Sequence, residues 1–193
     1  GIVPGAQTYP GMIQRVVYTS DNAFPNGVVL NGIPPPTGWV FSYSGCCRNQ
    51  ASNIVNATQY KWFIRSVMYP YGTQNTSSCF DHSARSAEPP PTVLCSGYPS
   101  SWHQAAYDPD MDSIAFSWAQ VIEGNLQMPI TAYYAAYAYN SPFPGTLQNA
   151  LNVPALLDPA KGIVSFTSYT QGSFVMVQRL ASWRNGTLIS EVF

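Results

Sequence analysis

The placement of proline constrains the fold of this chain more than any other feature. The sequence has 193 residues, 17 of them proline, and its two longest proline-free stretches lie between Pro36 and Pro70 and after Pro159. Proline inside a helix removes a backbone hydrogen bond and clashes with the preceding turn. Both proline-free stretches contain segments in which apolar and polar residues alternate, and neither follows a helical spacing. We therefore predict an all-β protein with essentially no helix.

The same alternation locates individual strands. Trp39, Phe41 and Tyr43 fall on one face of residues 37–44, and residues 60–68 repeat the pattern. Further alternating segments are Ile114 with Phe116 and Trp118, 130–139, Val164 with Phe166, 173–183 and 187–193. Asn185-Gly186 between the last two predicts a tight hairpin. About nine short strands separated by Gly, Pro and Asn turns are typical of antiparallel β-sandwiches.

Length and proline content suggest the domain organisation. The chain is long enough for one large domain or two small ones of roughly 100 residues each. The proline-rich stretch 89–99 suits a connector, because polyproline is stiff, extended and without ladder donors. We expect an N-terminal strand or arm at 1–27, an Ig-like domain at 28–95 and an Ig-like or cadherin-like domain at 96–193. The expected architecture is two tandem Ig-like antiparallel β-sandwich domains.

Charge and hydropathy exclude two classes of partner. Only 9% of residues are charged and the net charge is -1, so the chain offers no basic surface to nucleic acid. No run of roughly 18 apolar residues is present, and we expect no membrane insertion. Gly1 is followed by neither a basic nor an apolar leader segment, which fits a mature protein whose export signal has been removed. We expect an extracellular or cell-surface location.

The cysteines fit that location. They form an even set confined to one stretch: Cys46, Cys47, Cys79 and Cys95. Two disulfides that staple the first domain of an exported protein are the simplest interpretation, because the spacing is not that of a zinc site. Adjacent Cys46 and Cys47 can hardly bond each other without strain, so each is expected to pair with Cys79 or Cys95, in either arrangement.

A series of motifs gives a family resemblance. They lie, in chain order, at 31–39, 46–49 (CCRN), 79–81, 95–99, 108–113 (DPDMDS), 166–170, 183–186 and 191–193. Together they resemble a repeat of large secreted surface proteins of Bacteroidota that are associated with gliding motility and adhesion. The resemblance covers residues of roughly 28–193. It implies a secreted, Ig-like adhesin or filament component with no known catalytic activity.

The resemblance also suggests a mode of assembly. Members continue past the Glu-Val-Phe motif with another apolar strand, whereas this chain stops at Phe193. A sandwich without its last strand would leave an open edge, which is a template for strand addition. Ile13, Val16, Val17 and Tyr18 form an apolar segment that could fill the groove of the next subunit. The alternative is that the sequence is the ordered part of something longer.

Asp108, Asp110 and Asp112 are the one concentration of carboxylates. The resemblance implies that such aspartates can hold Ca²⁺, which prefers several oxygen ligands. An EF-hand is excluded, because Ser113 and Ala119 stand where that loop needs Gly and Glu. A turn capped by Asx side chains is the interpretation we favour. We expect no required cofactor, with Ca²⁺ as the candidate.

Catalysis is not expected. Asp81, His82 and Ser83 supply the three residue types of a hydrolase triad, but neighbours on an extended segment point to opposite faces. No nucleophile elbow, zincin motif or phosphate-binding loop occurs. We predict that the protein is not an enzyme.

Two surface features suggest other partners and modifications. Aromatic residues that could stack on glycans are concentrated at Tyr98, Trp102, Tyr107, Tyr133, Tyr134, Tyr137 and Tyr139. Candidate glycosylation sites are Asn56, Asn75 and Asn185, with Ser113 as an O-glycan candidate.

The resulting expectation is a structural subunit of an extracellular bacterial filament or fibre. It would assemble head-to-tail as a homopolymer, by strand addition or by end-to-end packing of sandwiches, in an adhesive role. The alternative is a monomeric adhesin module that binds glycans.

Overall fold

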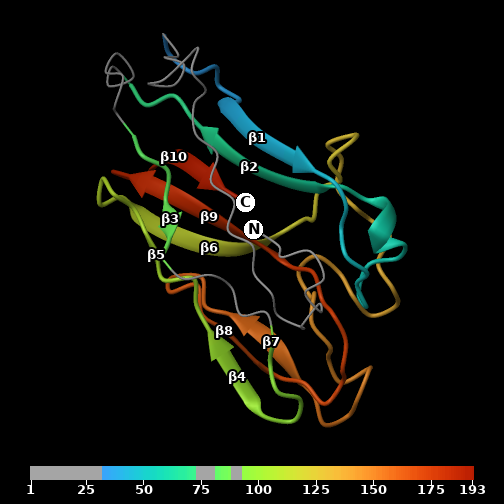
Figure 1. Ribbon diagram of the computed structural model, residues 1–193. Coiled ribbons are helices and arrows are strands. Elements are labelled where there is room, and N and C mark those ends of the chain that lie inside the picture. The colour runs from blue at the N-terminus through green and yellow to red at the C-terminus, as the bar shows by residue number, and fades with distance from the viewer. Residues whose placement is uncertain (1–31, 73–80, 88–92) are drawn as a thin grey trace, which may run out of the picture.

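The computed structural model describes residues 32–72, 81–87 and 93–193 and is built almost entirely of antiparallel β-structure (Figure 1). The one helical element in these ranges is a short 3-10 helix, η1 (Ala57–Gln59), so the predicted all-β class is confirmed. No helix in the same ranges is long and apolar enough to cross a membrane. The expected assembly strand 12–18, Asn75 and Cys79 lie outside the described residues.

The main sheet has five strands in the order β1-β2-β10-β9-β6. Their bounds are β1 Trp39–Gly45, β2 Trp62–Met68, β6 Ser113–Ala119, β9 Val177–Arg184 and β10 Thr187–Val192. All neighbours pair antiparallel. The last strand in the chain, β10, is therefore the central strand, and β1 and β6 are the two edges.

Two smaller sheets accompany the main one. The three-stranded sheet has the order β4-β8-β7, formed by β4 Pro99–Trp102, β7 Val153–Leu157 and β8 Val164–Thr167. The two-stranded sheet pairs β3 Arg85–Ser86 with β5 Ala106–Tyr107. In Figure 1 the three-stranded sheet lies at the far end of the molecule from β1, and the two-stranded sheet lies in front of the main sheet near β6 and β9.

The register of the main sheet decides which side chains share a face. Paired residues of antiparallel strands point to the same side, so Phe116, Leu180 and Val192 lie on one face. Phe116 and Leu180 are buried there with Ala84 beside β3, and Ala106 of β5 and Leu157 of β7 pack against them. The β6-β9-β10 half of this face is thus covered by the small sheets.

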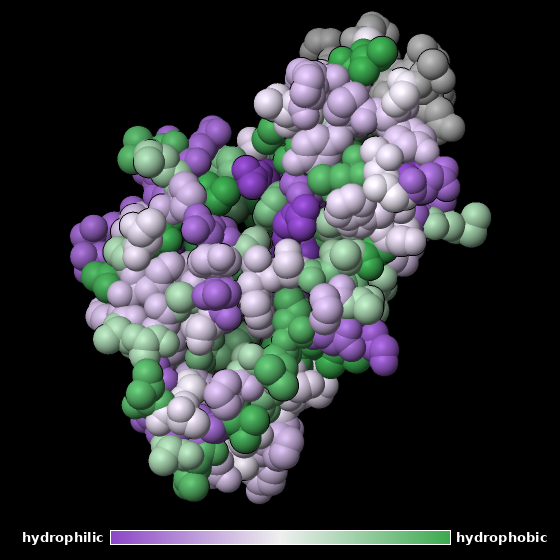
Figure 2. Space-filling view, turned by 180° about the vertical axis from the view of Figure 1, so that it is seen from behind, coloured by the Kyte–Doolittle hydropathy of each residue, from purple (hydrophilic) through white to green (hydrophobic). Residues whose placement is uncertain are grey.

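The described residues leave the other half of the same face, over β1 and β2, largely uncovered. Phe41 and Tyr43 of β1 pair with Ser66 and Ile64 of β2, and all four residues point to the side that carries Val192. Phe41, Tyr43 and Ile64 remain 45%, 42% and 54% exposed. Figure 2 shows the molecule from behind. Apolar and weakly polar residues cover much of this surface, and strongly hydrophilic residues form scattered patches.

A second core lies around η1. Ile54, Ala57, Val121 and Ile130 are buried together with Ala51. Arg48 of the CCRN motif lies beside this core and is only 3% exposed. Its Nη2 donates to the carbonyls of Lys61 and Ile122. Its guanidinium also lies over the ring of Trp62, 4.5 Å from the centroid. The motif thus has a packing role that ties the start of β2 to the segment after β6.

The sequence-based domain boundary runs through the main sheet. β1 and β2 precede residue 95, whereas β6, β9 and β10 follow it. The finer expectation of two tandem Ig-like sandwiches is not confirmed and stays a prediction. The expected open edge beside the last strand is absent among the described strands, because β10 is paired on both sides.

Candidate functional site

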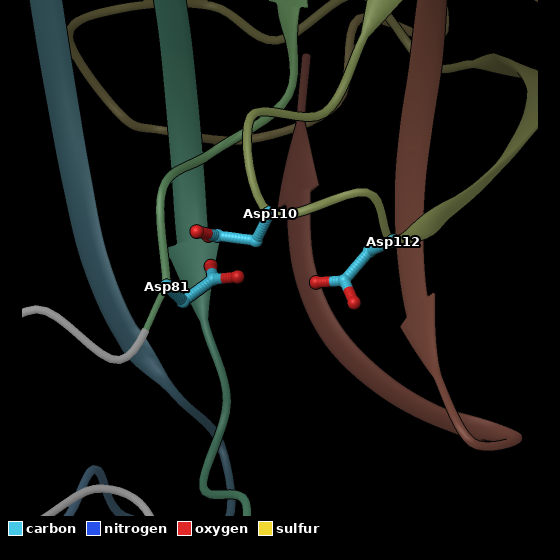
Figure 3. Close-up of side chains that lie close together, drawn as sticks. All are labelled: Asp81, Asp110 and Asp112. Atoms are coloured by element: carbon cyan, nitrogen blue, oxygen red, sulfur yellow. The ribbon is translucent and has the colours of Figure 1, made fainter.

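Three aspartates converge at one corner of the described structure (Figure 3). Asp81 precedes β3, Asp110 lies in the turn between β5 and β6, and Asp112 directly precedes β6. One carboxylate oxygen from each lies within 4.8 Å of the others. The structure therefore brings Asp110 and Asp112 together, as the sequence suggested, and adds Asp81, which had been considered only for a triad.

Asp108 does not belong to this group of oxygens. Its Oδ1 accepts hydrogen bonds from the backbone N–H groups of Asp110 (2.9 Å) and Asp112 (3.4 Å). Its Oδ2 accepts one from the hydroxyl of Ser182 at 2.9 Å. Asp108 thus caps its own turn and anchors it to β9, which is the Asx-turn interpretation of this segment.

A cation already lies among the three carboxylates. Arg184 at the end of β9 donates from Nε and Nη2 to the two oxygens of Asp112, both at 2.7 Å. The same Nη2 lies 3.4 Å from Asp81 and 3.7 Å from Asp110. Hydrogen bonding to Asp112 raises the pKa of Arg184, and this bidentate pair is the strong kind of charge-assisted contact.

His82 binds the third aspartate, Asp110. Its backbone N–H donates to Asp110 Oδ2 at 2.6 Å, and its Nδ1 lies 3.0 Å from Oδ1. Although burial acts to raise it, these hydrogen bonds from His82 lower the pKa of Asp110. A Ca²⁺ ion at this corner would have to displace Arg184 or His82, so the arrangement fits an ion-pair network better than a cation site. Ca²⁺ binding stays a prediction.

Asp81 is the member with the most unusual environment. Its side chain is fully buried, and burial raises its pKa to about 6, with the charge of Asp108 adding to the shift and that of Arg184 opposing it. Asp81, Asp108, Asp110 and Asp112 lie near a single arginine, Arg184. This excess of negative charge favours a proton on the buried carboxyl group of Asp81.

The hydrolase triad considered for these residues does not form. His82 Nδ1 faces Asp110 instead of Asp81, and the hydroxyl of Ser83 shares a hydrogen bond with Ser66 at 3.1 Å. The three side chains point to different neighbours, as expected for adjacent residues of an extended segment.

The open half of the main sheet is the second candidate site. A groove of about 300 Å³ runs over β1, β2 and the end of β10. Phe41, Tyr43, Ile64 and Val192 line it, and the guanidinium of Arg65 lies 4.2 Å from the ring of Phe193 at its border. Since β1 is an edge strand, this apolar groove adjoins a strand edge.

The cysteines are placed differently from the expectation. The sulfurs of Cys46 and Cys47 are within bonding distance of each other as an adjacent disulfide. Cys95 is exposed and has no disulfide partner among the described residues. Because Cys79 lies outside those residues, pairing with it stays a prediction.

The predicted tyrosine surface is divided. Tyr98, Tyr107, Tyr134 and Tyr139 are exposed, at 69%, 49%, 48% and 38%. Tyr133 instead packs against the core around Ile54, and Tyr137 packs against Phe174 with ring centroids 5.9 Å apart. Burial raises the pKa of both inward-facing tyrosines. Trp102, in β4, is only partly exposed.

The glycosylation candidates that the structure describes are exposed. Asn56 precedes η1 with a positive φ of 52°, and Ser113 opens β6. Asn185 forms the turn between β9 and β10, where its φ of 49° and the 77° of Gly186 suit a type I′ hairpin. Its side chain also donates to the hydroxyl of Tyr71 at 3.1 Å, so a glycan at Asn185 would have to replace that contact.

Comparison with known proteins identifies no relative. No family model, no curated protein and no solved structure matches this chain. The resemblance to Bacteroidota surface proteins therefore stays a prediction, and any account of function must come from the residues themselves.

Proposed function

We propose that this chain is a structural, non-catalytic subunit of an extracellular surface filament or fibre, in which strand β1 of one copy accepts a strand from the next. The observation that supports it is the seven-residue edge strand β1 beside the open apolar groove over β1 and β2. Exposed edges of this kind are usually shortened, charged or covered, because they attract other strands. Trp39–Gly45 contains no charged residue.

The other edge of the sheet is a poorer acceptor. The backbone N–H of Phe116 in β6 donates to the carbonyl of Pro159 at 2.8 Å, so the loop between β7 and β8 already occupies that edge. Leu157 and Phe116 also belong to one core cluster. Strand addition is therefore directed to β1.

We assign the donor to residues 12–18 of a neighbouring copy. This segment, Met-Ile-Gln-Arg-Val-Val-Tyr, has seven residues, as many as β1, and carries one charge. Alternating residues of a strand point to opposite faces, so Val16 and Tyr18 could extend the apolar row of Phe41 and Tyr43. Donor and acceptor are different surfaces, which gives a head-to-tail contact that builds an open polymer.

Other expectations accompany this proposal without being needed by it. They are two Ig-like units, glycans at the exposed Asn and Ser sites, and an adhesive role at the cell surface. Assembly by β1 requires no cofactor, and Ca²⁺ remains a candidate only. A monomeric glycan-binding module is the alternative, and the divided tyrosine surface does not favour it.

Deletion of residues 1–20 tests the proposal. The full chain is expected to sediment as a concentration-dependent polymer that electron microscopy shows as filaments, whereas the deletion variant should stay monomeric. A synthetic peptide of residues 10–20 should bind the deletion variant and shift the backbone NMR signals of β1. Polymers formed equally well by the deletion variant would exclude the segment as donor. A monomeric full chain would exclude the function itself.

A further inference from the structure

A third feature of the molecule is independent of the assembly surface. A pocket of about 380 Å³ lies between the three-stranded sheet and the loop 168–174 that follows β8. Its volume is within the usual range for small-molecule sites. None of the described residues that line it is charged: they are three phenylalanines, one leucine, and small or polar uncharged residues, including Cys95. The lining therefore excludes a ligand that needs an ion-pair partner.

The floor of the pocket is aromatic and held in place. Phe143 and Phe166 are stacked, with centroids 4.5 Å apart and planes inclined by 16°. Phe174 lies 6.4 Å from Phe143, and Trp118 meets Phe143 edge-on from outside the pocket lining at 6.3 Å. Phe166 is only 7% exposed, so the partly exposed rings of Phe143 and Phe174 supply the apolar surface of the pocket, with little side-chain freedom to lose on binding.

A buried amide positions two of these rings. Asn53 is fully buried, and its Nδ2 donates to the carbonyls of Pro142 (3.0 Å) and Val175 (2.7 Å). These are the chain neighbours of Phe143 and Phe174. The backbones that carry both rings are thus fixed by one side chain.

A second buried amide fixes the polar wall. Asn152 is 4% exposed; its Oδ1 accepts from Tyr169 N at 2.7 Å, and its Nδ2 donates to Thr170 Oγ1 at 3.0 Å. Because the Thr170 oxygen accepts this bond, its hydroxyl proton can be donated to a ligand. The hydroxyl of Ser168, next along the wall, donates to the carbonyl of Thr170 at 2.7 Å.

Two further polar side chains, Gln171 and Ser173, lie on the rim. Both residues are exposed, so a ligand can replace the solvent at the Gln171 amide and the Ser173 hydroxyl. The backbone of Ser173 is nevertheless anchored, since Ser52 N donates to its carbonyl at 2.6 Å and its own N–H donates to Ser52 Oγ at 3.2 Å. Anchored backbone with free donors and acceptors is a preorganised arrangement.

We propose that this pocket binds a neutral saccharide of one or two rings. A pyranose has an apolar C–H face that fits the aromatic floor and a rim of hydroxyls that can pair with Thr170, Gln171 and Ser173. A purely apolar ligand would make no use of the hydrogen bonds that Thr170, Gln171 and Ser173 offer. An acidic sugar would bury a carboxylate with no cation beside it. The site differs from the exposed tyrosines that the sequence suggested.

Titration with defined sugars tests the proposal, and NMR uses the monomeric residues 1–20 deletion variant, because filaments of the full chain are too large to give resolved signals. The probes are glucose, galactose, mannose, N-acetylglucosamine and their common disaccharides. Binding is measured by changes in the ¹⁵N chemical shifts of the protein backbone. At least one neutral probe is expected to shift the signals of residues 168–174 with a dissociation constant in the millimolar range. Glucuronic acid should leave them unchanged. Removal of a single ligand hydrogen bond by Ser173→Ala or Gln171→Ala should weaken binding about fivefold.

A neighbouring serine provides the matched control. Ser101 in β4 is exposed, and its hydroxyl lies 3.3 Å from that of Ser165 rather than in the pocket. Ser101→Ala should leave the affinity unchanged. Absence of shifts at residues 168–174 with every neutral probe, equal binding of glucuronic acid, or equal affinity of the Ser173→Ala and Ser101→Ala variants would each overturn the proposal. The full chain should bind the same sugars in equilibrium dialysis, which separates this site from the assembly surface.

Discussion

The side chain of Asn53 bonds both backbone polar groups of Val175, which lies 122 residues further along the chain. Its Oδ1 accepts from the N–H at 3.1 Å, and its Nδ2 donates to the carbonyl at 2.7 Å. This amide replaces a strand partner at the point where β9 has not yet begun. Residue 53 is therefore a structural link between two distant segments.

Replacement of Asn53 by Ala should be strongly destabilising. The change leaves the buried carbonyl of Pro142 and the partly buried N–H of Val175 without their partners, at a cost of about 2–4 kcal/mol in the free energy of unfolding. Urea denaturation measures it. Asn125→Ala, at an exposed position, is the control and should change stability by less than about 0.5 kcal/mol. Equal stability of the two variants would contradict the assigned role.

The glycines at 162 and 186 predict a contrast. Both have positive φ, 68° and 77°, but a Cβ at Gly162 would lie 2.5 Å from the ring of Phe116, whereas one at Gly186 would meet nothing within 4 Å. Gly186→Ala should cost about 1–2 kcal/mol for its backbone conformation alone. Gly162→Ala adds overpacking and should cost about 2–4 kcal/mol. Thermal unfolding of the two variants checks the order, and a smaller effect at Gly162 would be inconsistent with the packing described.

The buried Asp81 should make stability depend on pH. Its pKa of about 6 in the folded protein exceeds its value in the unfolded chain, so the folded state binds the proton more tightly. The stabilisation is complete below about pH 4 and is lost as the pH rises through about 6. Asp81→Asn keeps a neutral group there. The free energy of unfolding of Asp81→Asn minus that of wild type should therefore increase by on the order of 2 kcal/mol from pH 4.5 to pH 7.5.

Asp112 provides the opposite case at the same corner. It holds Arg184 with two hydrogen bonds, so Asp112→Asn should destabilise the protein by about 1–3 kcal/mol at pH 7. Unfolding curves at pH 4.5 and 7.5 for both variants separate the two roles. Parallel pH profiles for wild type and Asp81→Asn would show that residue 81 does not titrate in this range.

Two neighbouring residues of β1 test the assembly surface. Phe41 lines the apolar groove, whereas Val40 points to the opposite face of the same strand and does not line the groove. Phe41→Lys places a charge where a donated strand would pack and should abolish polymers, while the fold persists because the side chain is already 45% exposed. Val40→Lys, at a position that is 56% exposed, should polymerise far better than Phe41→Lys. Sedimentation velocity with circular dichroism measures both properties, and equal loss in the two variants would point to a general charge effect.

Much of the main sheet follows from the sequence alone. Alternation located β1, β2, β6, β8 and β10, and Asn185-Gly186 marked the hairpin between β9 and β10. The segment 130–139 was predicted as a strand, and this is wrong. Its positive φ of 70° at Ala136 and the turn bond from Tyr137 N to Tyr134 O break the extended backbone. Alternation there reflects tyrosines that pack inward at irregular intervals.

Other elements gave no local signal. β4 contains Pro99 and β7 contains Pro154. Because proline is disfavoured inside strands, the sequence did not indicate either strand. The acidic corner was half visible: the Asp-x-Asp spacing identified Asp110 and Asp112, but Asp81 and Arg184 join them only through folding. Asn53 and Asn152 could not be recognised at all, since a buried asparagine and a turn asparagine look alike in sequence.

The position of β10 at the centre of the main sheet has a consequence for how the chain reaches its native state. Tyr69, just past β2, bonds Glu191 in β10, 122 residues later, so β2 lacks its second partner strand until the last strand is present. A topology with such distant pairings folds slowly and exposes strand edges meanwhile. β1 and β2 can pair with each other early, but the second edge of β2 stays unpaired until β10 is present. The late arrival of β10 therefore makes the edge of β2 the place where the incomplete chain is open to aggregation.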